Sequence, residues 1–66
     1  MAMGERLKEA REKKEYTQKQ LAEFVGARHN SISNWEKGKN KPSTFMIERL
    51  CKVLEVSPSY LISGDD

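Results

Sequence analysis

Apolar positions recur at helical spacing along this chain of 66 residues, and they predict five helices. The clearest lies at residues 43–54, where Ile47, Leu50, Cys51 and Leu54 follow the i, i+3, i+4, i+7 pattern of an amphipathic helix. The other four helices are expected at residues 5–14, 18–25, 28–37 and 58–62. Since no run alternates convincingly at the strand period, the sequence predicts an all-α fold.

Capping residues agree with these limits. Thr17, with Gln20 three residues later, has the spacing of a capping box, and Gly26 suits the C-terminal stop of the same helix. Ser43 and Ser57 can cap the fourth and fifth helices. The second and third helices are short and are separated by a tight turn that contains glycine, which is the helix-turn-helix arrangement.

The third helix has little apolar surface. Ile32 and Trp35 are three residues apart, so they lie on one side of the helix and can anchor it to a core. The residues that fall largely on the other sides are His29, Asn30, Ser33 and Asn34. Asparagine and serine suit a merely solvated helix poorly, because their side chains compete for backbone hydrogen bonds. We therefore expect a use for them outside folding.

The size and composition fit one small domain, residues 1–66, and exclude several classes of protein. One cysteine and one histidine cannot form an internal disulfide or a Cys/His zinc site, so we expect no metal and no cofactor. The chain also offers little from which to build a catalytic site or a substrate pocket, so we expect neither an enzyme nor a small-molecule substrate. Cys51 fits a small buried hydrophobe. With no apolar run that resembles a membrane span or signal peptide, we expect a soluble, cytoplasmic protein.

Charge is unevenly distributed along the chain. Residues 1–41 hold ten Lys/Arg against six Asp/Glu, a net +4, whereas residues 42–66 hold two against four, a net −2. A polyanion would be attracted to one part of such a molecule. Charged residues on the solvated surfaces of ordinary helices would explain the uneven distribution equally well.

The segment "TQKQLAEFVGARHNSISNWEKG" resembles the helix-turn-helix of the Cro/C1-type (XRE-like) repressor family, which includes the lambdoid phage repressors. The matching positions are Gln18, Leu21, Ala22, Val25, Gly26, Ile32, Trp35, Glu36 and Gly38. The likeness continues over nearly the whole chain. It implies a compact five-helix lambda-repressor-like domain that binds a double-stranded DNA operator. It further implies a transcriptional regulator, most often a repressor, with two copies on a pseudo-palindromic site.

The resemblance places the third helix in the DNA major groove and implies base-reading roles for His29, Asn30 and Asn34. The chemistry agrees, because one asparagine amide can donate to adenine N7 and accept from N6, and an imidazole can address guanine. The alternative is that Asn30 caps the helix and His29 is a solvated surface residue.

Contacts to the DNA backbone are implied for Gln18, Ser31, Ser33, Lys39, Asn40 and Lys41. The lysines would act as point charges that raise affinity without reading sequence, although lysines are common in any polar loop. Ser31 or Ser33 could also reach a base. Arg11 and Glu36 are implied to form a structural ion pair between the first helix and the reading helix.

Four positions depart from the family pattern. Arg28 replaces the usual Ser or Thr cap of the third helix, so either the cap is lost or Arg28 contacts a phosphate or a guanine; we expect a DNA contact. Phe24 and Phe45 occupy positions that are more often polar, which suits either the edge of the core or a dimer contact. Glu55 stands where glycine commonly ends the fourth helix, so a tighter or more strained turn is expected.

Other functions remain open on the sequence alone. An antitoxin or a restriction-modification controller would use the same fold, and so would a protein-interaction module that does not read DNA. The chain stops at "GDD" after the last helix, which fits either the N-terminal part of a longer repressor with a dimerising domain or a complete small regulator.

Overall fold

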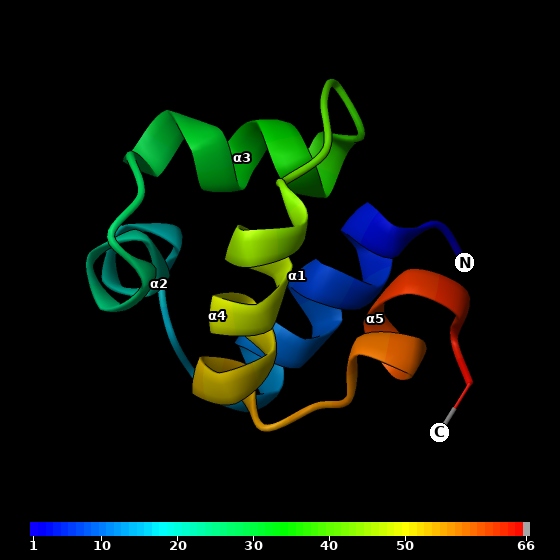
Figure 1. Ribbon diagram of the computed structural model, residues 1–66. Helices are drawn as coiled ribbons and strands as arrows, with labels where there is room; N and C mark the ends of the chain where they lie inside the picture. The colour runs from blue at the N-terminus through cyan, green and yellow to red at the C-terminus, as the bar shows by residue number, and fades with distance from the viewer. Residues whose placement is uncertain (66) are drawn as a thin grey trace.

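The computed structural model describes residues 1–65 and contains five helices within them (Figure 1). They are α1 (Met3–Lys13), α2 (Gln18–Val25), α3 (His29–Lys37), α4 (Thr44–Leu54) and α5 (Pro58–Ser63). No strand occurs in the part of the chain that the structure describes. This confirms the all-α prediction, and each helix end lies within two residues of its expected position.

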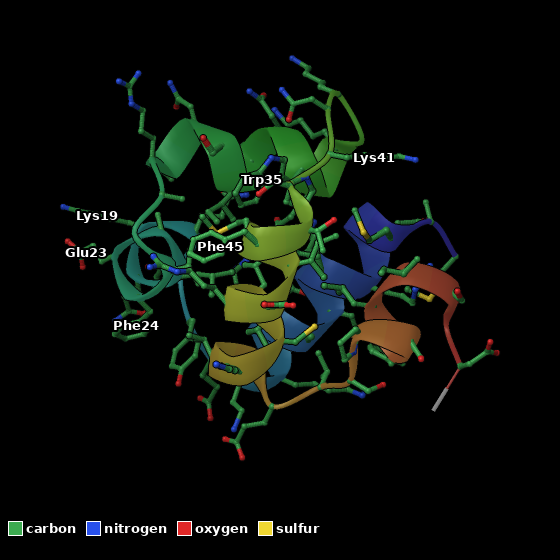
Figure 2. All side chains as sticks on the ribbon, in the orientation of Figure 1. Lys19, Glu23, Phe24, Trp35, Lys41 and Phe45 are labelled. Atoms are coloured by element: carbon green, nitrogen blue, oxygen red, sulfur yellow. The ribbon has the colours of Figure 1, made fainter. Side chains whose placement is uncertain are left out.

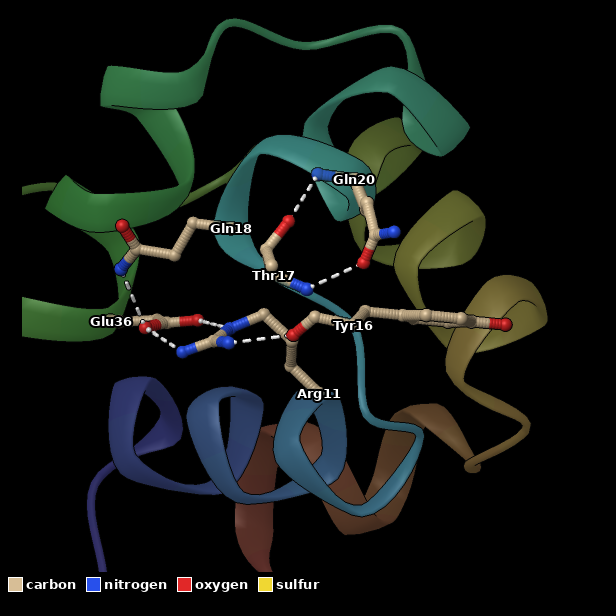
Figure 3. Close-up of polar contacts among 6 residues, drawn as sticks. All are labelled: Arg11, Tyr16, Thr17, Gln18, Gln20 and Glu36. Atoms are coloured by element: carbon tan, nitrogen blue, oxygen red, sulfur yellow. Dashed lines mark hydrogen bonds and ion pairs between the residues drawn. The ribbon is translucent and has the colours of Figure 1, made fainter.

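The predicted capping residues form the expected bonds. The Thr17 hydroxyl accepts from the Gln20 N–H at 3.0 Å, and the Gln20 amide oxygen accepts from the Thr17 N–H at 2.9 Å (Figure 3). Gly26 ends α2 in the left-handed region at φ 76°. The hydroxyls of Ser43 and Ser57 accept backbone N–H groups in the first turns of α4 and α5. These contacts satisfy N–H groups that a helix leaves unpaired.

All five helices contribute to one apolar core. The buried apolar residues are Leu7, Ala10, Leu21, Ala22, Val25, Ile32, Trp35, Leu50, Cys51, Leu54 and Leu61. Cys51 is buried as expected, and burial raises the pKa of its thiol. Helix α3 lies across one end of the molecule and packs on α1 and α2 (Figure 1). The core therefore fixes the inner side of α3 and leaves its outer side uncovered.

Helix α1 begins at Met3 and not at residue 5, because the Glu5 carboxylate accepts the Ala2 backbone N–H at 2.9 Å and stabilises an extra half-turn. This start brings Gly4 against the backbone of α3. A Cβ at Gly4 would lie 2.5 Å from the carbonyl oxygens of both Trp35 and Glu36. Only glycine permits so close an approach of α1 to α3.

A buried arginine, which the sequence did not predict, joins α1 to α5. The Arg6 side chain donates from Nε to the Leu61 carbonyl at 3.0 Å and from Nη2 to the Ile62 carbonyl at 2.7 Å. It also donates to the Met1 carbonyl. These carbonyls of α5 lack partners within the helix, so Arg6 satisfies the C-terminal end of a helix of only six residues.

Two non-glycine residues adopt the left-handed backbone conformation. Glu55, the C-cap of α4, has φ 58°, and Glu15 in the α1–α2 connection has φ 60°. The expectation of strain at Glu55 is confirmed, because this conformation brings the Cβ of an L residue close to its own backbone. The Glu55 carboxylate pairs with Lys14, and their hydrogen bond raises the pKa of Lys14 and lowers that of Glu55.

Candidate nucleic-acid interface

The outer side of α3 carries the polar residues that the sequence singled out. Ile32 and Trp35 point into the core, and Figure 2 shows Trp35 beneath the helix. Arg28, His29 and Asn30 are exposed at its start. Ser31, Ser33 and Asn34 are half-buried. An imidazole and two amides are thus presented on one short helix, with their hydrogen-bonding groups available to a ligand.

The N-terminus of α3 has no side-chain cap. Arg28 occupies the N-cap position with extended backbone, and its side chain makes no capping hydrogen bond. Asn30 lies inside the helix, so the alternative in which Asn30 caps α3 is wrong. The usual Ser/Thr cap is lost, and the partial positive charge of the helix start coincides with the Arg28 guanidinium. This end of α3 is suited to an anionic ligand.

The loop that follows α3 is basic and exposed. Gly38 ends the helix at φ 77°, and Lys39, Asn40 and Lys41 follow it. All three are exposed, and Figure 2 shows Lys41 pointing away from the body of the protein. Among residues 1–65, no carboxylate forms an ion pair with either lysine. Their positive charges are therefore free to attract an anion.

A buried ion pair connects α1 to α3 (Figure 3). Arg11 donates from Nε to Glu36 Oε2 at 2.6 Å and from Nη2 to Oε1 at 3.2 Å. The two side chains are only 10% and 4% exposed. Arg11 Nη1 also donates to the Tyr16 carbonyl at 2.8 Å. The hydrogen bond to Glu36 raises the pKa of Arg11.

Gln18, the first residue of α2, belongs to the same network. Its Nε2 donates to Glu36 Oε1 at 3.0 Å (Figure 3). Sequence reasoning assigned Gln18 only to the DNA backbone and did not predict this contact. No sequence signal identifies it, because the two residues are 18 positions apart and lie on different helices. The start of α2 is thereby tied to the helix that carries the base-reading candidates.

Phe24 and Phe45 remain largely exposed, at 54% and 63%. The Phe24 ring meets Tyr16 edge to face at a centroid distance of 4.9 Å, and the Phe45 ring lies under the Arg49 guanidinium at 4.8 Å. They project from α2 and α4 respectively (Figure 2). This exposure fits an intermolecular contact better than a place at the core edge.

Residues 1–65 lack two other functional features. No three His, Cys, Asp or Glu side chains come together as metal ligands would. No helix in this range has the length and apolar character needed to cross a membrane.

Comparisons with known proteins agree with this geometry. A helix-turn-helix family model matches residues 7–61. The regulator ImmR of Bacillus subtilis is 41% identical and DicA of Escherichia coli 35% identical, each over the whole chain. The chain spans about half the length of these two relatives, 52% and 49%. The c2 repressor of Salmonella phage P22, solved in complex with a synthetic operator, is 37% identical with a TM-score of 0.95, and 98% of each chain is covered.

Proposed function

The chain belongs to the helix-turn-helix family. We propose that it binds double-stranded DNA sequence-specifically and regulates transcription as a repressor. The observation that carries the proposal is the outer side of α3, where an imidazole and two amides stand on a helix whose buried apolar residues are Ile32 and Trp35. The P22 c2 repressor, which shares this fold, was solved with operator DNA and supports the same partner.

In the proposed complex, α3 lies in the major groove and the residues that read bases are Arg28, His29, Asn30 and Asn34. The residues that contact phosphates are Gln18, Ser31, Ser33, Lys39, Asn40 and Lys41. Two copies would occupy half-sites about 34–36 Å apart, one turn of DNA, and so would read a pseudo-palindrome. A protein that regulates bacterial or phage genes in this way would act in the cytoplasm.

The decisive experiment is selection of random duplex DNA on the protein at two salt concentrations, followed by sequencing of the bound pool. The test variant carries alanine at positions 29, 30 and 34, and the matched control is Lys52→Ala, which removes an exposed cation from α4. We expect a palindromic site to be enriched by the wild type and the control and lost in the test variant.

Other outcomes would revise the proposal. Salt-sensitive retention without enrichment would indicate binding to phosphates alone. No retention at either salt concentration would favour the protein-interaction module, with the exposed Phe24 and Phe45 as the first residues to test.

A further inference from the structure

The Glu36 carboxylate is shared between two helices that approach it from different sides. Its Oε1 accepts from Arg11 Nη2 at 3.2 Å and from Gln18 Nε2 at 3.0 Å, while Oε2 accepts from Arg11 Nε at 2.6 Å. The ion pair alone would join α1 to α3. The additional bond from Gln18 uses a further lone pair of the carboxylate to hold a side chain at the start of α2 (Figure 3).

We propose that Glu36 is a positioning residue that orients the Gln18 amide for a DNA phosphate, an inference that rests on the proposed function. A glutamine Nε2 carries two hydrogens in one plane. With one donated to Glu36, the plane is fixed and the second hydrogen is directed away from the carboxylate. Without this acceptor, the terminal torsion of glutamine is broad, and binding would have to order it.

Arg11 makes this arrangement compatible with DNA. A lone carboxylate beside a phosphate contact would repel the phosphate, because like charges in one site are unfavourable. The guanidinium at 2.6 Å neutralises Glu36. Arg11 also holds the Tyr16 carbonyl at 2.8 Å, two residues before Gln18, so the connection that leads into α2 is fixed by the same side chain.

The first test needs no DNA and no variant. In NMR spectra of the free protein, one Nε2 proton of Gln18 should be shifted downfield and exchange slowly with water. Gln20 is the matched control, because its amide oxygen accepts the capping bond while its Nε2 donates to no group in the described residues. Equal behaviour of the two glutamines would overturn the proposal.

The second test compares two variants that differ only in the acceptor. Arg11→Met with Glu36→Leu replaces the buried pair by apolar side chains, which commonly preserves folding. Arg11→Met with Glu36→Gln keeps an acceptor oxygen without a charge. We expect the glutamine variant to bind the selected DNA site about two- to tenfold more tightly than the leucine variant, because ordering one free side chain on binding usually weakens affinity by that factor. Circular dichroism must show both variants folded at the assay temperature. If the leucine variant does not fold, Arg11→Met with Glu36→Met takes its place, because the flexible methionine side chain also removes the oxygen acceptor, and the same difference in affinity is expected.

Adding Gln18→Ala to each protein makes the result specific. If Glu36 acts through Gln18, the difference in affinity should disappear in this background. A difference that persists would assign Glu36 a structural role only, and full affinity of Gln18→Ala itself would also overturn the proposal. If the wild type selects no DNA site, the proposed function fails instead, and the amide protons of Gln18 still report the local geometry.

Discussion

Replacing Gly4 by alanine should destabilise the protein, although the same change stabilises most helices. In a helix interior, alanine is ordinarily favoured over glycine by about 0.5–1 kcal/mol. Here the new Cβ would lie 2.5 Å from two backbone carbonyl oxygens of α3, whereas ordinary contacts begin near 3.4 Å. Helices α1 and α3 would have to separate by about 0.9 Å. Overpacking of this kind costs about 1–3 kcal/mol, so we expect a net loss of about 1–2 kcal/mol.

Urea unfolding measures this change directly. Trp35 is the single tryptophan and is 9% exposed, so its fluorescence reports unfolding at the contact in question. Circular dichroism, followed in parallel, separates global unfolding from a local change around Trp35. Lys8→Ala on the exposed side of α1 is the matched control and should change stability by less than about 0.5 kcal/mol. A Gly4→Ala protein as stable as the wild type, or more so, would refute the close approach of the two helices.

Four further substitutions test the proposed DNA contacts and the strained backbone. Asn34→Ala should relax preference at one or two base positions by about 1–3 kcal/mol per lost pairing, and an unchanged selected site would exclude that role. Lys39→Ala and Lys41→Ala should each weaken binding to all DNA sequences and reduce the salt dependence of the affinity by about one phosphate contact. An unaltered salt dependence would exclude a phosphate contact by that lysine. Glu15→Gly should raise the free energy of unfolding by about 0.5–1 kcal/mol, because φ 60° strains an L residue; a loss of stability in urea would contradict this.

The helices could be predicted because their signals are local. Apolar spacing and caps lie within a few residues of one another. Thr17, Ser43 and Ser57 cap the starts of helices where expected, and Gly26 ends α2. The exposure of His29 on α3 also followed from helical spacing alone. Periodicity of this kind determines which side of a helix faces the core before any tertiary contact is known.

The contacts that could not be predicted depend on how the helices pack. Arg6 is an ordinary charged residue in a helical sequence, and only packing places it against carbonyl groups 55 positions away. The sequence around Gly4 favours a helix and does not predict the close contact, because the need for glycine there depends on the distance between α1 and α3. The bond from Gln18 to Glu36 likewise joins separate helices. The pairing of Arg11 with Glu36 was expected only through the family resemblance.

These long-range contacts are concentrated in α1 and are largely polar. Gly4 meets the backbone of α3, Arg6 binds carbonyl groups of α5, and Arg11 binds Glu36. None of them involves the exposed residues at the start of α3. Because stability rests on the inner side of α3 and on α1, the exposed side chains of His29 and Asn30 contribute little to folding, and substitutions there should change stability by less than about 0.5 kcal/mol. His29 can therefore change while the scaffold that holds α3 stays the same, and under the proposed function such a change would alter binding specificity.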